Sequence, residues 1–180
     1  MPFIAKHLAE NFVICFIIVN YLGYDLEKAV EIIKKYTPKM GRGKILDVKI
    51  KNKPIKIIAD YYNSSPTSLK SAIEYLSLMN GSKYAIIGDM TELGKDSQKL
   101  HCSIAYYLNK TNIKKVFLIG QIIKNISNLI DQSIECFCYD NIEKFDISDH
   151  FFDYNSYILL KASRSLHFEK ILNQGVINVL

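Results

Sequence analysis

Short apolar runs alternate with amphipathic helical segments through the second half of the chain. The apolar runs lie at 54–59, 84–87, 115–119, 134–138 and 157–160, and the helical patterns at 67–79, 96–108, 121–130, 142–145 and 165–172. This alternation is typical of a mostly parallel sheet with helices on both faces. We therefore expect a Rossmann-like α/β fold, with residues 175–180 as an extra edge strand.

The first fifty residues follow a different pattern. Helical segments are expected at 6–22 and 25–36, where Gly23 ends the first and Asp25 caps the second. The run TPKMGRG at 37–43 then breaks the periodicity, and a strand at 44–50 is expected to form a hairpin with the strand that starts at residue 54. These features predict two parts, a helical segment at 1–38 and an α/β domain at 39–180.

Composition indicates a soluble globular protein, because 49% of the 180 residues are hydrophobic and 23% are charged. The apolar run 12–19 is far shorter than the ~20 residues that span a bilayer, so we expect one buried helix there. The four cysteines lack the spacing of a metal or disulfide framework. We expect no metal site in the chain and a location in the reducing cytoplasm.

Basic residues are concentrated between Lys34 and Lys56, a stretch that contains nine Lys or Arg residues and only one acid, Asp47. Such a basic belt suits an anionic partner, either the phosphates of a nucleotide or nucleic acid. For most of these lysines a solvated surface in a lysine-rich protein is the preferred interpretation. Arg42 stands apart from the lysines, because the glycines on either side should leave it exposed and mobile enough to reach an anion.

Polar residues follow three of the predicted strands. They are the segments DYYNSSP at 60–66, GDMTELG at 88–94 and KASRS at 161–165. Because parallel strands end at the same edge of a sheet, these segments should together line a binding cleft. Ser65 and Pro66 suit the N-cap and first position of the helix that follows. The run GDMTELGK is no phosphate loop, because it has one residue too many and lacks the Ser or Thr that binds magnesium.

Three longer stretches together resemble the C-terminal domain of the Mur ligases, and most closely the MurF type. They are IIADYYNSSPTSLKSAIEYL at 57–76, AIIGDMTELGKDSQKLH at 85–101 and LLKASRSLHFEKIL at 159–172, which follow the family patterns D-x-Y-N-x-x-P, L-G-D-M-x-E-L-G and K-G-S-R. Upstream, HLAEN at 7–11 is similar to the helix that closes the family's central ATP-binding domain. KMGR at 39–42 is similar to its linker arginine. The resemblance extends over essentially the whole chain.

The resemblance implies an ATP-dependent amide ligase of peptidoglycan precursor synthesis. Such an enzyme joins D-alanyl-D-alanine to UDP-N-acetylmuramoyl-tripeptide through an acyl phosphate. By the same resemblance Asn11 would contact the adenine, Asp60 the ribose, and Arg42 the γ-phosphate as the catalytic residue. The residues expected to bind substrate are Tyr62, Asn63, Ser64, Asp89, Glu92, Ser163 and Arg164.

The chain departs from the family patterns at three positions. Leu8 and Ser65 stand where the family has Asn, and Ala59 replaces an acidic residue. The family's phosphate loop, Mg²⁺ ligands and modified lysine belong to segments that would precede Met1. We therefore expect the missing N-terminal and central domains as partners and the chain alone to be inactive. Two alternatives remain open from the residues alone, a non-catalytic α/β nucleotide-binding module and a basic polyanion-binding protein.

Overall fold

The computed structural model describes residues 6–174 and 177–179, with side chains from residue 10 to 174. The strands are β1 (Lys44–Ile50), β2 (Lys53–Asp60), β3 (Lys83–Gly88), β4 (Lys115–Ile119), β5 (Glu135–Tyr139), β6 (Ser156–Lys161) and β7 (Ile177–Val179). The α-helices are α1 (Lys6–Tyr21), α2 (Leu26–Lys34), α3 (Pro66–Ser77), α4 (Ser97–Leu108) and α5 (Glu169–Leu172). Short 3-10 turns are η1 (Gly94–Asp96), η2 (Ile123–Leu129), η3 (Ile142–Lys144), η4 (Ile147–Asp149) and η5 (Arg164–Leu166).

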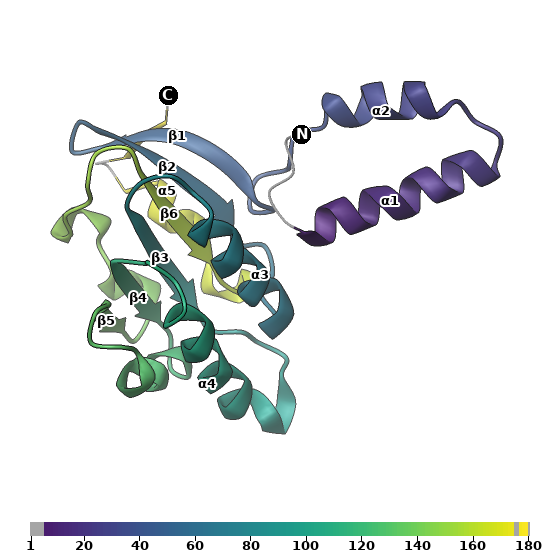
Figure 1. Cartoon of the computed structure of the whole chain (residues 1–180). Coiled ribbons are helices and arrows are strands. Elements are labelled where there is room, and N and C mark those ends of the chain that lie inside the picture. The colour runs from purple at the N-terminus through teal and green to yellow at the C-terminus, as the bar shows by residue number, and fades with distance from the viewer. Residues whose placement is uncertain (1–5, 175–176, 180) are drawn as a thin grey trace.

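The described strands form one sheet in the order β5-β4-β3-β6-β2-β1-β7 (Figure 1). β2, β6, β3, β4 and β5 run parallel, whereas β1 is antiparallel to both β2 and β7. The mostly parallel sheet is therefore confirmed. The expected hairpin joins β1 to β2, and Lys51 and Asn52 at its tip both have positive φ, as a tight two-residue turn requires. The expected edge strand is seen at 177–179, and the rest of 175–180 lies outside the described residues.

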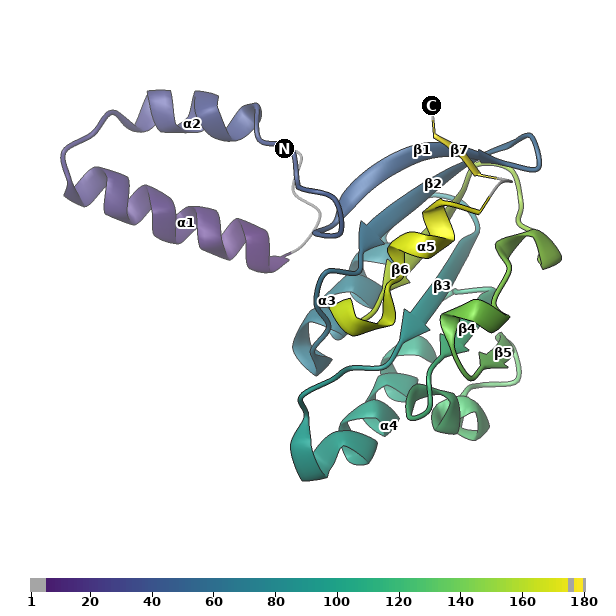
Figure 2. The same cartoon turned by 180° about the vertical axis from the view of Figure 1, so that it is seen from behind.

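Two apolar cores sandwich the sheet, and their residues alternate along each strand. Helices α3 and α4, with η2, cover one face, where Leu69, Ile73 and Ile104 are fully buried. The other face is covered by α5 and the segment around η3 and η4, where Phe145, Phe152 and Phe168 are buried (Figure 2). Helices on both faces are thus confirmed.

The second half of the chain is less helical than its pattern predicts. The segments expected as helices at 121–130 and 142–145 are the 3-10 turns η2 and η3. The helix expected at 165–172 is split into η5 and α5, because His167 between them adopts a left-handed φ of 54° that no right-handed helix can include. Apolar spacing in these short stretches shows which face is buried, not whether the α-helical bonds form.

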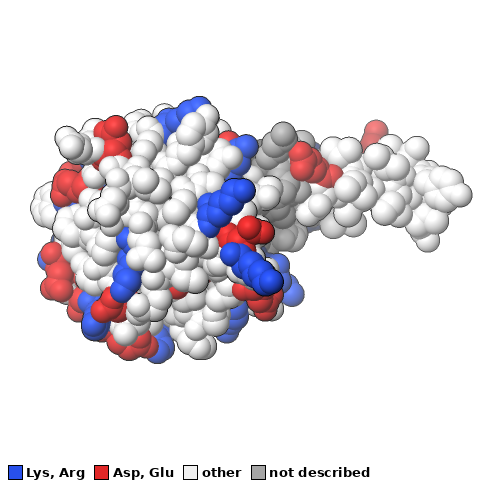
Figure 3. Space-filling model, turned by 90° about the horizontal axis from the view of Figure 1, so that it is seen from below, with Lys and Arg blue, Asp and Glu red and all other residues white. Residues whose placement is uncertain are grey.

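Helices α1 and α2 form an antiparallel pair that projects from the α/β body (Figure 1). The prediction that 12–19 is buried is wrong, since the side chains of Val13, Ile14, Ile17 and Ile18 are all more than half exposed. No described part of the chain covers this apolar face, and α2 has no buried residue. Seen from below, the projecting pair is mostly uncharged (Figure 3). Within the described residues no helix combines the length and apolarity needed to cross a bilayer.

Candidate functional site

The three polar segments predicted from the sequence meet at the carboxyl edge of the sheet, the side viewed in Figure 3. β6 lies between β2 and β3, and Lys161 at its end is paired in register with both Asp60 and Ile87. Segments 60–66, 88–94 and 161–165 therefore leave neighbouring strands at the same level. This edge is where parallel α/β sheets bind ligands.

The turn from β2 into α3 is built as predicted. The Ser65 hydroxyl accepts a hydrogen bond from the Ser68 amide (3.3 Å) and the Ser68 hydroxyl accepts one from the Ser65 amide (3.0 Å), a reciprocal cap with Pro66 at the first helical position. The Asn63 side-chain oxygen accepts from the Ser64 amide at 2.8 Å. The Ser64 hydroxyl is buried and has no hydrogen-bond partner within the described part of the chain.

Lys161 holds this turn, although the sequence motifs do not single it out. Its side chain is 2% exposed, and its Nζ lies 3.0 Å from Oδ2 of Asp60 and donates to the Asn63 carbonyl at 2.6 Å. The sequence does contain a sign of this ion pair, because one apolar strand ends in Lys161 and another ends in Asp60. Because Asp60 is 22% exposed and already paired, it presents only part of its carboxylate to a ligand.

Arg42 is docked onto the end of β2. Gly41 and Gly43 on either side of it are buried, with φ of 78° and 82°. The Gly43 amide donates to the Ala59 carbonyl and the Tyr62 amide to the Gly41 carbonyl, both at 2.8 Å. The expected exposure of Arg42 is confirmed, and these bonds join the backbone on either side of it to the end of β2.

Two arginine side chains approach the ring of Tyr62. The Cζ atom of Arg42 lies 4.0 Å from the centre of its ring, and that of Arg164 lies 5.8 Å from it. Arg164 also approaches Glu169, with 3.5 Å between Nη1 and Oε2. Burial alone would raise the pKa of Glu169, but hydrogen bonds and the charge of Arg164 outweigh it, and the pKa is lowered. Tyr62 itself is 45% exposed, so this cationic cluster faces solvent.

Asp89, expected to bind substrate, is occupied by the backbone of a neighbouring turn. Its carboxylate accepts hydrogen bonds from the amides of Gln121 (2.9 Å), Ile122 (3.1 Å) and Ile123 (2.6 Å). Gly120 is required beside it, since a Cβ there would lie 2.4 Å from the Asp89 carboxyl carbon. Asp89 therefore fixes the loop after β4 rather than offering a free carboxylate.

His101 and Ser163 hold the GDMTELG loop from two sides. Nε2 of the fully buried His101 accepts from the Met90 amide at 2.9 Å, and its Nδ1 lies 2.7 Å from the Ser97 carbonyl, to which it donates. The hydroxyl of Ser163, 2% exposed, accepts from the Thr91 amide at 2.9 Å. Both side chains are thus hydrogen-bonded within the protein. Glu92 and Arg164, which follow in the two loops, are exposed.

The predicted substrate residues accordingly divide into two groups. Tyr62, Asn63, Glu92 and Arg164 are exposed at the edge, whereas Ser64, Asp89 and Ser163 are buried or engaged within it. Glu92 has a left-handed φ of 64°, uncommon for a non-glycine residue and a form of strain found at functional loops.

A cavity of about 210 Å³ opens beside the Asp89 turn. It is lined by Asp89, Gly120, Gln121, Asp140, Asn141, Ile142, Glu143, Ser165, Leu166 and His167. The hydrogen bonds and charges of Lys124 and Lys144 lower the pKa of Asp140 to about 2. The cavity rim is therefore anionic at neutral pH but locally balanced by lysines.

Asn11, expected to contact adenine, lies in α1 with an exposed side chain. Among the described residues no group of three or more His, Cys, Asp or Glu side chains is arranged to hold a metal ion.

Comparison with known proteins gives concordant matches. The family profile described as "Mur ligase, glutamate ligase domain" matches residues 41–156. The UDP-N-acetylmuramoyl-tripeptide--D-alanyl-D-alanine ligase of Rickettsia prowazekii is 36% identical over 176 residues, which cover 96% of this chain and 38% of that protein. The ligase of the same name from Bacillus subtilis is 28% identical and is covered to the same 38%. The chain thus spans less than two-fifths of the length of these curated relatives.

Solved structures support the fold. The chain superimposes on a crystal structure of MurF from Acinetobacter baumannii with a TM-score of 0.79 and 24% identity, covering 98% of this chain and 38% of that one. A MurF ligase from Thermotoga maritima in complex with ADP matches with a TM-score of 0.65 and 22% identity, over 88% of this chain and 35% of that one. The Rossmann-like arrangement expected from the sequence is therefore confirmed.

Proposed function

The chain belongs to the Mur ligase family, and from this premise we propose that it forms the C-terminal part of an ATP-dependent amide ligase. The ligase would add D-alanyl-D-alanine to UDP-N-acetylmuramoyl-tripeptide, the reaction named for its relatives from Rickettsia prowazekii and Bacillus subtilis. The observation that carries the proposal is the carboxyl edge. There Lys161 and Ser163, both in the segment 161–165, bond to the turn at 60–66 and to the loop at 88–94.

The proposed reaction has two steps. ATP supplies the phosphoryl group that turns the tripeptide carboxylate into an acyl phosphate. The dipeptide amine then attacks the acyl carbon, loses a proton and displaces phosphate to leave the new amide. Such chemistry depends chiefly on positioning and on neutralising charge. The exposed side chain of Arg42, whose guanidinium lies over the ring of Tyr62, suits the second task.

The residues divide between nucleotide and acceptor in this proposal. Arg42 contacts the transferred phosphoryl group, and Asp60 offers the ribose the part of its carboxylate that Lys161 leaves open. Asn11 would contact the adenine from the helical pair. Tyr62, Asn63, Glu92 and Arg164 face the acceptor dipeptide, while Ser64, Asp89 and Ser163 shape the loops that carry them.

The helical pair supports the proposal that 1–38 ends a central ATP-binding domain. Its exposed apolar face is the kind of surface that a further domain covers. We place the boundary two residues later than the pattern of the sequence indicated, because Gly41 and Gly43 are bonded to β2 and the family profile begins at residue 41. The Mg²⁺ ligands and the phosphate loop are expected in the part of the relatives that this chain does not match. We also propose a cytoplasmic location for the protein.

The two alternative functions gain less support. In the basic belt, Lys34 pairs with Glu31 and Lys56 with Asp47, which reduces the free charge available to a polyanion. A non-catalytic nucleotide-binding module would leave the acceptor-side loops without a role.

A chimeric ligase tests the proposed function. Residues 1–180 would replace the matching region of the Rickettsia prowazekii ligase, and amide formation from UDP-N-acetylmuramoyl-tripeptide, D-alanyl-D-alanine, ATP and Mg²⁺ would be followed by mass spectrometry. We expect product from the chimera and neither ATP hydrolysis nor product from 1–180 alone. A folded chimera that binds ATP but makes no amide, or turnover by 1–180 alone, would contradict the proposal.

A further inference from the structure

Two cysteines occupy the same face of β5, the last described strand at one end of the sheet, which pairs with β4 alone among the described strands. Side chains alternate along a strand, so Cys136 and Cys138 project to one face and Phe137 to the other. The packing agrees with this alternation. Phe137 stacks on Phe117 in one core, whereas Cys136 packs against the core on the opposite face. The two thiols are therefore neighbours on the face that η2 covers.

The two thiols have different surroundings. The Cys138 side chain is exposed, and its Sγ lies 3.8 Å from the carbonyl oxygen of Lys124 in η2. Cys136 is half-buried, and burial, together with the charge and a hydrogen bond of Cys138, raises its pKa to about 12. That hydrogen bond brings the two thiols into direct contact. Because the thiolate is the reactive form of cysteine, a reagent in solution should react with Cys138 first.

The spacing of the pair allows a disulfide, but not a relaxed one. Two residues advance a strand by about 6.6 Å, close to the upper limit of about 6.8 Å between Cα atoms that a disulfide joins. A bridge therefore requires β5 to shorten locally, which is easier in a strand that pairs with one described neighbour than in a central one. Strained and exposed disulfides are the readily reduced ones. The spacing favours a reversible bridge over a permanent structural one.

The carboxyl end of β5 is bonded to the loop that follows β4. The Gly120 amide donates to the Tyr139 carbonyl at 2.9 Å. The amides that follow Gly120 in this loop donate to the Asp89 carboxylate. Because Cys138 directly precedes Tyr139, a bridge at Cys138 would act next to a contact that holds this loop.

We propose that Cys136 and Cys138 form a reversible oxidation site, a dithiol that a low-molecular-weight disulfide converts to an intramolecular disulfide. The Cys138 thiolate attacks one sulfur of the reagent, so that a mixed disulfide forms and one thiolate leaves. Cys136 then loses its proton to solvent and attacks Sγ of Cys138, and the second thiolate leaves. The protein gives up two electrons and two protons, and the small disulfide is reduced to two thiols. The site does not depend on the proposed ligase activity.

Peptide mapping of 1–180 tests the site directly. The chain would be equilibrated with mixtures of reduced and oxidised glutathione, its free thiols alkylated with N-ethylmaleimide, and its tryptic peptides identified by mass spectrometry. The tryptic peptide 125–144 contains both cysteines and no other. We expect it to carry an internal disulfide as the oxidised fraction of glutathione rises, and to recover both free thiols when the buffer is made reducing.

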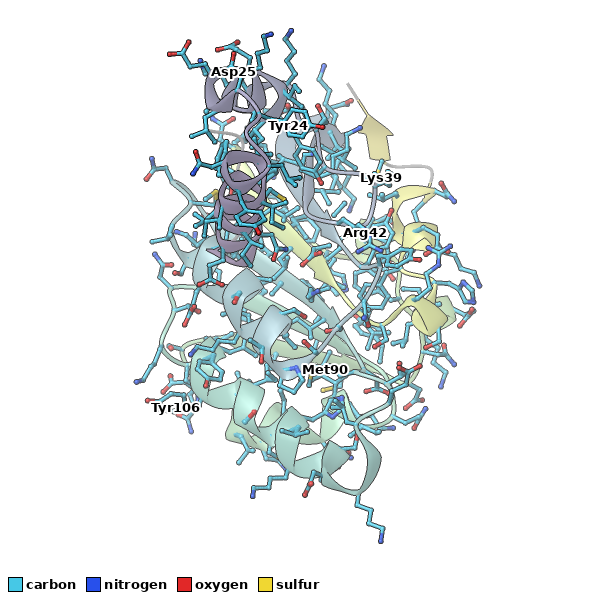
Figure 4. All side chains as sticks on the ribbon, turned by 90° about the vertical axis from the view of Figure 1, so that its right-hand side faces the viewer. Tyr24, Asp25, Lys39, Arg42, Met90 and Tyr106 are labelled. Carbon is cyan, nitrogen blue, oxygen red and sulfur yellow. The ribbon has the colours of Figure 1, made fainter. Side chains whose placement is uncertain are left out.

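Cys102 is the internal control, because it is a partly exposed thiol in a helix that contains no second cysteine. It lies one turn before Tyr106, which marks α4 in Figure 4. Its tryptic peptide, 100–110, also contains no other cysteine. Cys102 should form at most a mixed disulfide with glutathione, and 125–144 should already contain its internal bridge at the same oxidant level.

Single substitutions separate the roles of the two thiols. Cys136→Ser should leave a stable mixed disulfide at Cys138, since the thiol that makes the second attack is removed. Cys138→Ser should react with oxidised glutathione at least about tenfold more slowly than Cys136→Ser, because the thiol that remains is half-buried and has a raised pKa. Far-UV circular dichroism of each variant checks that it folds as the parent chain does.

Four results would overturn the proposal. They are mixed disulfides in 125–144 without an internal bridge, no oxidation of 125–144 where Cys102 is already modified, a bridge that forms only in chain unfolded by urea, and a bridge that reduced glutathione does not reopen. Equal reaction rates of the two folded serine variants would reject the assigned order of attack. An inactive chimera would bear on the proposed function alone and leave this site standing.

Discussion

Lys161→Met should destabilise the protein strongly, because Lys161 joins two segments of the candidate site from a buried position. The side chain of Lys161 is 2% exposed and that of Asp60 22%, with 3.0 Å between Nζ and Oδ2. The same ammonium donates to the Asn63 carbonyl at 2.6 Å. Methionine retains an unbranched apolar chain of similar reach but leaves a partly buried carboxylate without a counter-charge and a carbonyl without its donor.

The expected loss follows from these two contacts. Breaking a fully buried ion pair by removing one partner costs about 3–5 kcal/mol, and Asp60 retains some access to water, which reduces its share. A lost hydrogen bond to the Asn63 carbonyl contributes about 1 kcal/mol. We expect the free energy of unfolding to fall by about 2–4 kcal/mol in total.

Urea unfolding followed by far-UV circular dichroism measures this loss in a chain that has no tryptophan. Lys56→Met is the matched control, because Lys56 pairs with Asp47 on the same sheet at 43% exposure and should cost less than about 1 kcal/mol. Asp60→Asn in the Lys161→Met background should recover part of the loss, since it removes the unpaired charge. Equal losses for Lys161→Met and Lys56→Met, or additive effects of the two site substitutions, would refute the reasoning.

Three further predictions concern the loops and the core around the site. Gly120→Ala should lower the free energy of unfolding by about 2–4 kcal/mol, because its Cβ would lie 2.4 Å from the Asp89 carboxyl carbon; a change below about 0.5 kcal/mol in thermal unfolding would argue against that contact. His101→Phe should cost about 1–3 kcal/mol and speed amide exchange at Met90, whose N–H loses its acceptor; unchanged exchange would contradict this. Burial lowers the pKa of His150 below 6.5, so the unfolded chain binds the proton more readily, and stability should decline as pH falls below about 6.5. His150→Phe should flatten that decline in urea unfolding between pH 7.5 and 5, and an unaltered slope would be evidence against it.

The secondary structure was only partly predictable from the sequence. Apolar runs such as 115–119 and 157–160 predict strands well, because buried parallel strands are apolar on both faces. The cap at Ser65 and Pro66 was predictable from local chemistry and is present. The 3-10 turns at 123–129 and 142–144 were not, since their bonding depends on how each short stretch packs against the sheet.

The sequence predicted which segments meet at the edge of the sheet, but not the direction in which their side chains face. Asp89 and Ser163 follow strand ends, as ligand-binding residues do, yet their side chains are bonded to neighbouring loops. That outcome depends on contacts between segments distant in sequence. Lys161 was missed for the same reason, because its role appears only when β2 and β6 lie side by side.

The helical pair shows the limit of apolar periodicity. The run 12–19 predicts burial, but the structure leaves its side chains exposed because the described residues provide nothing to pack against them. Apolar periodicity identifies the apolar face of a helix, but it does not identify what packs against that face.

The most direct test of the proposed function is the rate of amide formation by the chimera carrying Arg42→Gln. In the proposed function Arg42 contacts the phosphoryl group in transfer, and arginines in this role contribute about 10³–10⁵ in rate. Lys99→Gln, an exposed charge removed from α4, is the control. The account predicts that Arg42→Gln lowers kcat at least about a hundredfold relative to Lys99→Gln. A kcat within about twofold of that control would contradict a part for this edge in phosphoryl transfer.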